Sequence, residues 1–210
     1  MQGDYRGQYG NQWQVGMMDA PCANTGTFCI ALCCLPCANY KLRQDALNGD
    51  VSNYKCCQGY LDNRCFTAGT KGDQGSAFCM CLEACCCISC MVSSTRQLVM
   101  DTRNIAPDPC DNRIIRFNNC IQWLSCICDI LACFDSSFRE AAMLVDCIAQ
   151  GVFACTAACM TAQTDLEIKK AGAQAYNFGN VQVAQQSGAN WGQRKGGNGA
   201  MPPQQAGMVR

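Results

Sequence analysis

Residues 76–100 read SAFCMCLEACCCISCMVSSTRQLVM, and this stretch indicates the fold class most clearly. Ser76 is a favoured residue for the N-cap of a helix, where its hydroxyl accepts a hydrogen bond from the first turn. The stretch is also dense in cysteine: it contains Cys79, Cys81, Cys85, Cys86, Cys87 and Cys90. We therefore predict a cysteine-rich helix here.

Three further segments, 27–47, 111–134 and 137–170, carry helical patterns. In the first, Cys29, Cys33 and Cys37 stand four residues apart and are expected on one helix face, and Gly49-Asp50 ends the segment. The last keeps helical spacing of its apolar residues Ala142, Val145, Ala149, Val152 and Phe153. No strand-like alternation persists anywhere. The chain is predicted to be mainly α, a compact Cys-rich helical bundle with extended, irregular N- and C-terminal tails.

The cysteines divide the 210 residues into three parts, because all 22 lie between Cys22 and Cys159. We expect a polar N-terminal tail (1–21), a Cys-rich helical core (22–170) and a Gly/Gln/Asn-rich C-terminal tail (171–210). The last part holds eight Gly, seven Gln and four Asn, a composition that buries too little apolar surface to order by itself. A partner that ordered it is expected to contact its aromatic residues: Tyr176, Phe178 and Trp191.

Composition excludes several function classes. Lys plus Arg equals Asp plus Glu at 16 each, so no overall field attracts nucleic acid. The chain has no His, which removes Ser-His-Asp triads, Cys/His pairs and mixed His/Cys zinc sites. Residues 1–10 have neither a basic nor an apolar region of a secretory signal, so a cytoplasmic location is expected, where stable disulfides are disfavoured.

Long apolar runs raise the question of a membrane. Residues 77–94 are apolar except for Glu83, and they form the best membrane candidate by length. Asp129 and Asp146 interrupt the later apolar segments, and an acidic group at bilayer depth is costly. The mean hydropathy of the chain is −0.06. A soluble or peripheral bundle is favoured over a polytopic one.

Other polar and aromatic residues are expected to have structural roles. Asp129 and Asp146 are predicted to form ion pairs with arginines, since a buried carboxylate needs a partner. Asp111 is predicted to cap the helix that follows Pro109. Trp123 is predicted to lie in the core.

Four interpretations of the cysteines stay open. They can be small buried hydrophobes, disulfides formed across helices, S-acylated anchors or metal ligands. For S-acylation, the run Cys85-Cys86-Cys87 is the natural place and gives peripheral membrane contact. For metal, the spacing CxxC occurs twice, and both units can share one zinc site. The candidate ligands are Cys33, Cys34, Cys37, Cys87 and Cys90.

Three of these stretches resemble the PLAC8 (placenta-specific 8) family of cysteine-rich proteins. They are Cys33-Cys34-Leu35-Pro36-Cys37, where Leu35 replaces a family cysteine; Cys85 to Cys90 followed by Arg96; and Asp146-Cys147 with Cys155, Cys159, Gln163 and Glu167-Ile168-Lys169. The resemblance implies a membrane-associated protein linked to cell-size control or heavy-metal handling, without an established catalytic centre.

The function expected first is that of a non-enzymatic structural or interaction protein, whose Cys-stabilised core carries tails that bind protein partners in a larger assembly, such as a cytoskeletal or ciliary one. The alternative is a membrane-associated PLAC8-like metal-handling or regulatory protein at the cytoplasmic face. A thiol redox enzyme built on Cys34/Cys37 or Cys87/Cys90 is disfavoured, because no βαβ pattern accompanies either pair.

Overall fold

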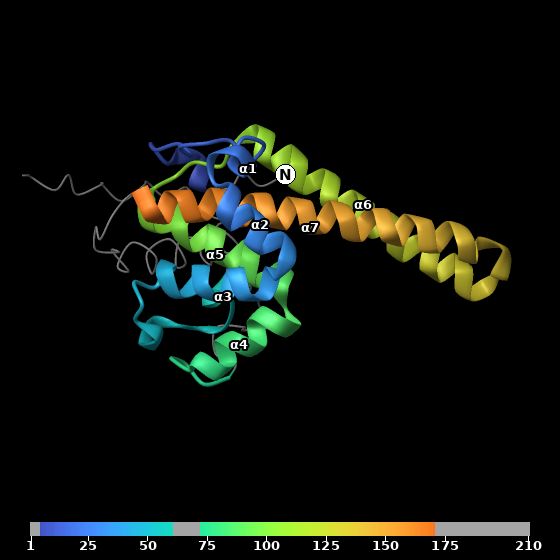
Figure 1. The fold of residues 1–210 in the computed structure, drawn as a ribbon, viewed down its shortest axis with the longest axis horizontal. Helices are drawn as coiled ribbons and strands as arrows, with labels where there is room; N and C mark the ends of the chain where they lie inside the picture. The colour runs from blue at the N-terminus through green and yellow to red at the C-terminus, as the bar shows by residue number, and fades with distance from the viewer. Residues whose placement is uncertain (1–4, 61–71, 171–210) are drawn as a thin grey trace, which may run out of the picture.

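A computed structural model describes residues 5–60 and 72–170, and their regular structure is helical, as predicted. In Figure 1, two long helices run side by side and project from a cluster of shorter ones. We call the projecting part, residues 117–153, the hairpin, and the remaining described residues the head. The helices are α1 (Ala20–Ala23), α2 (Thr25–Cys33), α3 (Leu35–Ala46), α4 (Ala77–Cys86), α5 (Ile88–Arg103), α6 (Pro109–Phe134) and α7 (Arg139–Lys170).

The predicted helix over 27–47 is broken into α2 and α3 at Cys34. Pro36 stands in the first turn of α3, where it needs no backbone N–H; inside a continuous helix its ring would meet the carbonyl of Leu32. Cys34 has φ −145° and ψ 80°, and its N–H closes α2 by donating to Ile30 O at 2.8 Å. The expected common face of Cys29, Cys33 and Cys37 is therefore wrong, because Cys37 belongs to a different helix.

The predicted helix over residues 76–100 also breaks, at Cys87. Ser76 does cap α4, since its hydroxyl accepts from Cys79 N at 3.4 Å. Cys87 then leaves helical geometry (φ −130°, ψ 44°), and α5 continues at an angle of 118° to α4. The bend places α4 against α3, so that Glu83 meets Arg43.

The head buries an apolar core around charged side chains. Leu47, Tyr54, Met80, Met91 and Leu98 belong to one buried cluster. Three ion pairs are buried beside it, joining Arg6 to Asp101 (2.7 Å), Arg43 to Glu83 (3.2 Å) and Arg96 to Asp111 (2.7 Å). Asp111 thus pairs with Arg96, and Asp108 rather than Asp111 caps α6, accepting from Cys110 N at 2.6 Å.

The N-terminal segment is irregular, as predicted, and packs onto the head. A short 3-10 turn (Tyr5–Gln8) is followed by bends and turns up to α1. Trp13 and Met17 are buried, and the guanidinium of Arg96 lies 4.1 Å from the centre of the Trp13 ring. Residues 5–21 therefore help to build the core.

The predicted helices over 111–134 and 137–170 are confirmed as α6 and α7. They are joined by a 3-10 turn, Ser136–Phe138, in which Asp135 accepts from Ser137 N at 2.9 Å. The half of α7 that follows the hairpin, residues 154–170, contributes buried residues to the head, including Ala157, Ala158 and Met160. One helix therefore connects the two parts.

Candidate functional site

The two helices of the hairpin meet along a seam of small and polar residues spaced by seven. On α6 the buried members are Asp111, Asn118 and Ser125, and on α7 they are Ala142, Ala149 and Thr156. A repeat of seven keeps one stripe of a helix facing its partner. The seam becomes more polar toward the head on both helices, since Ser125 leads to Asn118 and Asp111.

Large apolar side chains cover the outside of the hairpin. Trp123 is 72% exposed and Phe134 is 85% exposed, so the prediction that Trp123 lies in the core is wrong. The other exposed large hydrophobic residues of the hairpin are Phe117, Leu124, Ile127, Ile130, Leu131, Phe138, Met143, Leu144 and Ile148. The hairpin is therefore inverted relative to a water-soluble helix pair, because its small and polar residues face inward and its large apolar residues face outward.

The polar groups inside the hairpin bond to one another across the seam. Gln122 Nε2 donates to Ala149 O at 2.7 Å, and the hydroxyl of Ser125 donates to a carboxylate oxygen of Asp146. The predicted arginine partner of Asp146 is thus replaced by Ser125. Asp129 lies on the exposed face of α6, about 9 Å along the helix from Asp135. These two bonds satisfy the amide of Gln122 and the hydroxyl of Ser125, whereas the buried Oδ1 of Asn118 has no hydrogen-bond partner among the described residues.

Two helical segments of the described chain are long and apolar enough to cross a membrane. They are Pro109–Phe134 and Ser136–Lys170, and the bent pair α4–α5 adds a third if it counts as one span. The best candidates are therefore the two arms of the hairpin and not residues 77–94. Asp135 follows Arg116 by 19 residues, which is about 28 Å of helix and close to the roughly 30 Å thickness of a hydrocarbon core.

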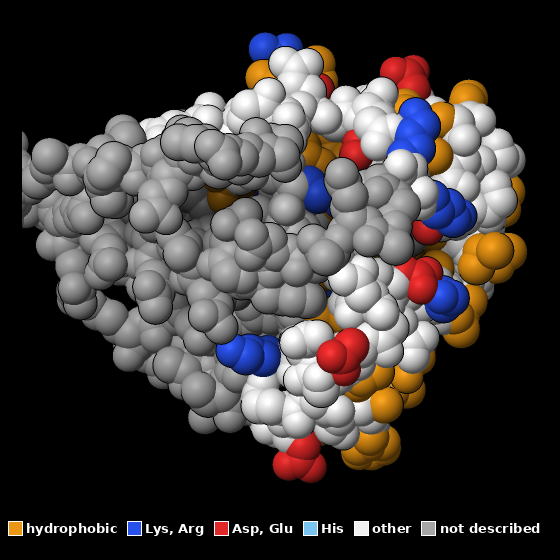
Figure 2. All heavy atoms as spheres, turned by 90° about the vertical axis from the view of Figure 1, so that its left-hand side faces the viewer, with side chains coloured by type: hydrophobic (Ala, Val, Ile, Leu, Met, Phe, Trp, Pro, Cys, Tyr) orange, Lys and Arg blue, Asp and Glu red, His pale blue; other side chains and the backbone are white. Residues whose placement is uncertain are grey.

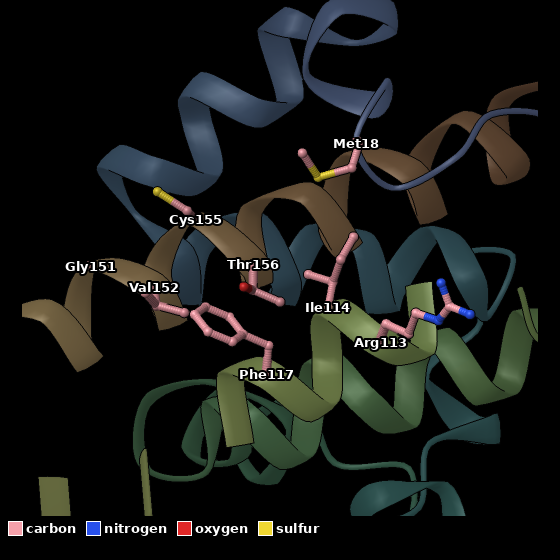
Figure 3. A pocket seen from close by; sticks show the side chains of 8 residues that line it. All are labelled: Met18, Arg113, Ile114, Phe117, Gly151, Val152, Cys155 and Thr156. Atoms are coloured by element: carbon pink, nitrogen blue, oxygen red, sulfur yellow. The ribbon is translucent and has the colours of Figure 1, made fainter. Parts of the chain in front are cut away.

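A groove of about 520 Å³ opens where the hairpin joins the head. Figure 3 shows Phe117 of α6 directed toward Val152 of α7, with Met18 above them and Arg113 at one end. Its lining is almost entirely apolar, and Arg113 supplies the charge. The apolar surface thus extends from the hairpin to the edge of the head.

Figure 2 views the molecule from the end opposite the hairpin turn. Hydrophobic side chains gather along the right-hand edge, and charged side chains lie beside that edge and are scattered from the top of the view to the bottom. In the head, exposed hydrophobic residues include Met18, Ile30 and Leu32 at the N-terminal side and Phe78 and Leu82 on α4. Exposed apolar surface is therefore not confined to the hairpin.

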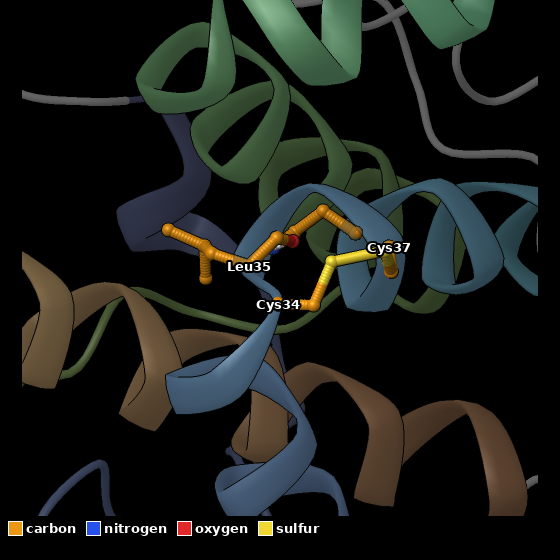
Figure 4. Close-up of a disulfide and its surroundings, with 4 residues drawn as sticks. Cys34, Leu35 and Cys37 are labelled. Carbon is orange, nitrogen blue, oxygen red and sulfur yellow. Dashed lines mark hydrogen bonds between the residues drawn. A yellow bond between two sulfur atoms is a disulfide. The ribbon is translucent and has the colours of Figure 1, made fainter.

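The predicted metal ligands do not come together as one site. Cys34 and Cys37 form a disulfide across the start of α3 (Figure 4), so neither sulfur is a free thiolate there. Cys33 is an exposed free thiol on α2, and Cys87 and Cys90 lie at the α4–α5 break. The prediction that both CxxC units share one zinc site is corrected by the break at Cys34 and by this bond.

The remaining cysteines of the described residues are free thiols, and most are exposed. Only Cys57 among them is fully buried, so the packing interpretation fits few of the cysteines. Extensive bridging is also absent from the described residues, where one disulfide is formed. Cys85, Cys86 and Cys87 are all exposed, and S-acylation at this run stays a prediction.

A different thiol cluster is formed by Cys56, Cys57 and Glu83, and sequence reasoning did not find it. One ligand atom from each residue lies within 4.8 Å of the others. Burial is the main cause that raises the pKa of the Cys56 and Cys57 thiols, and the negative charge of Glu83 adds to it. The Cys56-Cys57 dipeptide was visible in the sequence, but nothing marked Glu83 as its neighbour.

The predicted partner-binding residues Tyr176, Phe178 and Trp191 lie outside the described residues, so their role stays a prediction. No family model, curated protein or solved structure matches this chain. The resemblance to the PLAC8 family therefore also stays a prediction. What is known of the site comes from the geometry of the chain itself.

Proposed function

We propose that this chain is a non-enzymatic membrane protein in which the hairpin crosses the bilayer and holds the cysteine-rich head at one surface. The inverted pattern of the hairpin carries the proposal. Soluble monomers rarely expose a continuous apolar patch larger than a few hundred Å². Here both arms expose large side chains such as Trp123, Leu124 and Phe134.

The seam also has the chemistry of helix packing in lipid. Lipid chains are as apolar as Leu, so burying large apolar residues between helices gains little there, and small residues allow close backbone approach instead. Ala142 and Ala149 serve this purpose on α7. Polar atoms inside a membrane need internal partners, and the pairs Ser125–Asp146 and Gln122–Ala149 supply such partners for the side chains that they join.

The charges at the two ends of the hairpin suggest its orientation. Arg113 and Arg116 lie at the head end of α6, and the turn carries Asp135, Arg139 and Glu140. Lys and Arg are enriched in cytoplasmic segments next to membrane spans. The head is therefore assigned to the cytoplasmic face, with the turn Ser136–Phe138 at the opposite face.

The test combines extraction with mapping of the turn. A flexible Gly/Ser loop carrying an Asn-X-Ser/Thr acceptor is inserted between Ser136 and Ser137, and the chain is translated with endoplasmic-reticulum microsomes. We expect the protein to resist alkaline carbonate extraction and the inserted loop to be glycosylated. The matched control places the same loop in the exposed turn at Gly49 and Asp50 of the head, where it stays unmodified.

Release of the protein by carbonate would overturn the proposal. It would favour the alternative, a structural protein whose apolar hairpin is covered by other subunits of an assembly. If the protein stays in the membrane but its turn is never glycosylated, the hairpin does not cross the bilayer. It would then lie within one leaflet.

A further inference from the structure

The head contains a second candidate site, formed by the thiols of Cys56 and Cys57 and the carboxylate of Glu83. The two sulfurs lie 4.0 Å apart, close to the roughly 3.8 Å that separates two sulfurs bound at about 2.3 Å to one tetrahedral zinc ion. A carboxylate oxygen of Glu83 is within 4.8 Å of both. The three groups come from two segments, the 3-10 turn Cys56–Gly59 and α4.

The backbone that presents these thiols has an uncommon shape. Cys57 and Gln58 both have φ 48°, in the left-handed region that non-glycine residues seldom adopt. Glu83 holds the turn, because its Oε2 accepts from Cys57 N and from the Tyr54 hydroxyl, each at 2.9 Å. Such conformations cost on the order of 1–3 kcal/mol each and concentrate at functional sites.

Two more thiols belong to the bend that follows α4. Cys87 and Cys90 form the CxxC unit at the α4–α5 break, and both are free. Neither joins Cys56, Cys57 and Glu83 within 4.8 Å, so the cluster among the described residues has three members.

We propose that Cys56 and Cys57, together with a carboxylate oxygen of Glu83, bind one thiophilic divalent cation of the zinc class. Glu83 Oε1 accepts one hydrogen bond, from Arg43, and a carboxylate oxygen has a second lone pair for a metal ion. Ligand sets that contain thiolates select zinc and similar ions over magnesium or calcium.

The surrounding charge suits a thiolate site. A divalent cation with two thiolates and one carboxylate has a net charge of −1, and burying such a charge needs a compensating cation. Arg43 is fully buried beside the cluster, and its Nη1 makes no hydrogen bond to the described residues. Its positive charge is fixed in place by Glu83 and by the hydroxyl of Thr95 at 2.8 Å.

Binding exchanges protons for the metal and involves no oxidation. Each thiol that becomes a ligand forms one metal–sulfur bond and releases one proton to solvent. The ordinary pKa of a cysteine thiol is about 8.5, so a thiol that binds the cation at neutral pH must lose its proton. The cation must displace those protons, so its affinity is expected to fall as the pH falls and to rise as the pH rises.

The experiment uses the full chain, purified in detergent without oxygen and after reduction. Metal analysis is expected to find about one zinc ion per chain, and titration of the metal-free protein with cadmium should produce the ultraviolet sulfur-to-cadmium absorption of thiolate ligands. Cys56→Ser and Cys57→Ser should each weaken cadmium binding by about tenfold or more, a loss at least equal to that seen for outer-shell changes.

Two controls separate this site from the other thiols. Cys81→Ser changes an exposed thiol of α4 and should leave the affinity unchanged. Cys37→Ser removes the Cys34–Cys37 pair, and a loss of binding in this variant would overturn the assignment. Circular dichroism confirms that each variant keeps its helices.

Other outcomes also decide the question. Metal-free protein that shows no sulfur-to-cadmium absorption would overturn the proposal, as would binding that Cys56→Ser leaves unchanged. The outcome is independent of the membrane test, because a head released from membranes can still bind the cation and an inserted hairpin can still carry a metal-free head.

Discussion

The head and the hairpin of this chain differ in the kinds of side chain that they bury and expose. In the head, charged side chains such as Arg43 and Arg96 are buried with carboxylate partners, and apolar side chains surround them. In the hairpin, the buried stripe is small or weakly polar and the large apolar residues are outside. The contrast indicates that the two parts were shaped by different surroundings.

The polarity of the fully buried positions changes in steps along α6 and α7. On α6 the seam passes from Asp111, which pairs with Arg96, through Asn118 to Ser125. On α7 the buried positions pass from Gln163, which donates to Asp111 at 2.9 Å, through Thr156 to Ala149. The fully buried positions thus lose polarity with distance from the head, but the half-buried Asp146, which accepts from Ser125, lies beyond Ala149. In lipid this carboxylate would need its internal partner, because polar groups at bilayer depth are costly.

The largest effect is expected from breaking a buried charge pair in the head. Arg43→Met leaves Glu83 buried without its cation and should destabilise the head by about 3–5 kcal/mol. Denaturant titration of helical content in detergent measures the loss. Lys41→Met is the matched control on the same helix, because the Lys41–Asp45 pair is exposed and should contribute at most about 1 kcal/mol. Equal effects of the two changes would contradict the buried role of Arg43.

The second effect concerns the outer face of the hairpin. Ile127→Arg places a charge near the middle of α6 and should oppose membrane insertion by about 2.5–3.5 kcal/mol on insertion scales. The fraction of protein that resists carbonate extraction measures this. Ser93→Arg adds the same charge to an exposed position of α5 and should change nothing. If both variants insert equally well, the outer face of α6 does not contact lipid.

Sequence reasoning found the helices but could not tell which of their faces is covered. Helical spacing and the Ser76 cap are local signals, and they predicted α6, α7 and the start of α4 correctly, but not the breaks within 27–47 and 76–100. The exposure of Trp123 was missed because an apolar residue fits a protein core and a lipid contact equally well. Pro36 marked the α2–α3 break, but the bend at Cys87 carries no Gly or Pro.

The candidate thiol site was hidden for a similar reason. Cys57 and Glu83 are 26 residues apart in the sequence, and the tertiary fold brings them together through the hydrogen bond from Cys57 N to Glu83. Both CxxC units were visible, but spacing alone does not say which sulfurs meet. The Cys34–Cys37 bond is local, since the two residues are three apart, whereas the contact of Cys56 and Cys57 with Glu83 depends on tertiary packing.

A smaller effect is expected from filling the seam. Ala149→Leu puts a larger side chain where the two helices approach closely and should cost about 1–3 kcal/mol. Hydrogen exchange of α6 and α7 in bicelles should show lost protection on both helices. Ile148→Leu, at the exposed neighbouring position, is the control and should leave protection unchanged. A seam that tolerates Leu at position 149 would mean that the arms are not closely packed there.

The smallest expected effect tests most directly whether lipid or protein surrounds the hairpin. Ser125→Ala removes the hydroxyl that donates to Asp146. In bilayers, double-mutant cycles on such interhelical hydrogen bonds average about 0.6 kcal/mol and reach about 1.7, because the separated helices find other partners. The coupling energy between Ser125→Ala and Asp146→Ala, measured by unfolding in bicelles, should therefore fall in this range, although Ser125 is itself buried. A coupling as large as the effect of breaking Arg43–Glu83 would place Asp146 in a charged, tightly packed protein interior. The hairpin would then be packed as the head is, around a buried charge. Its apolar outer face would need a protein partner in place of lipid.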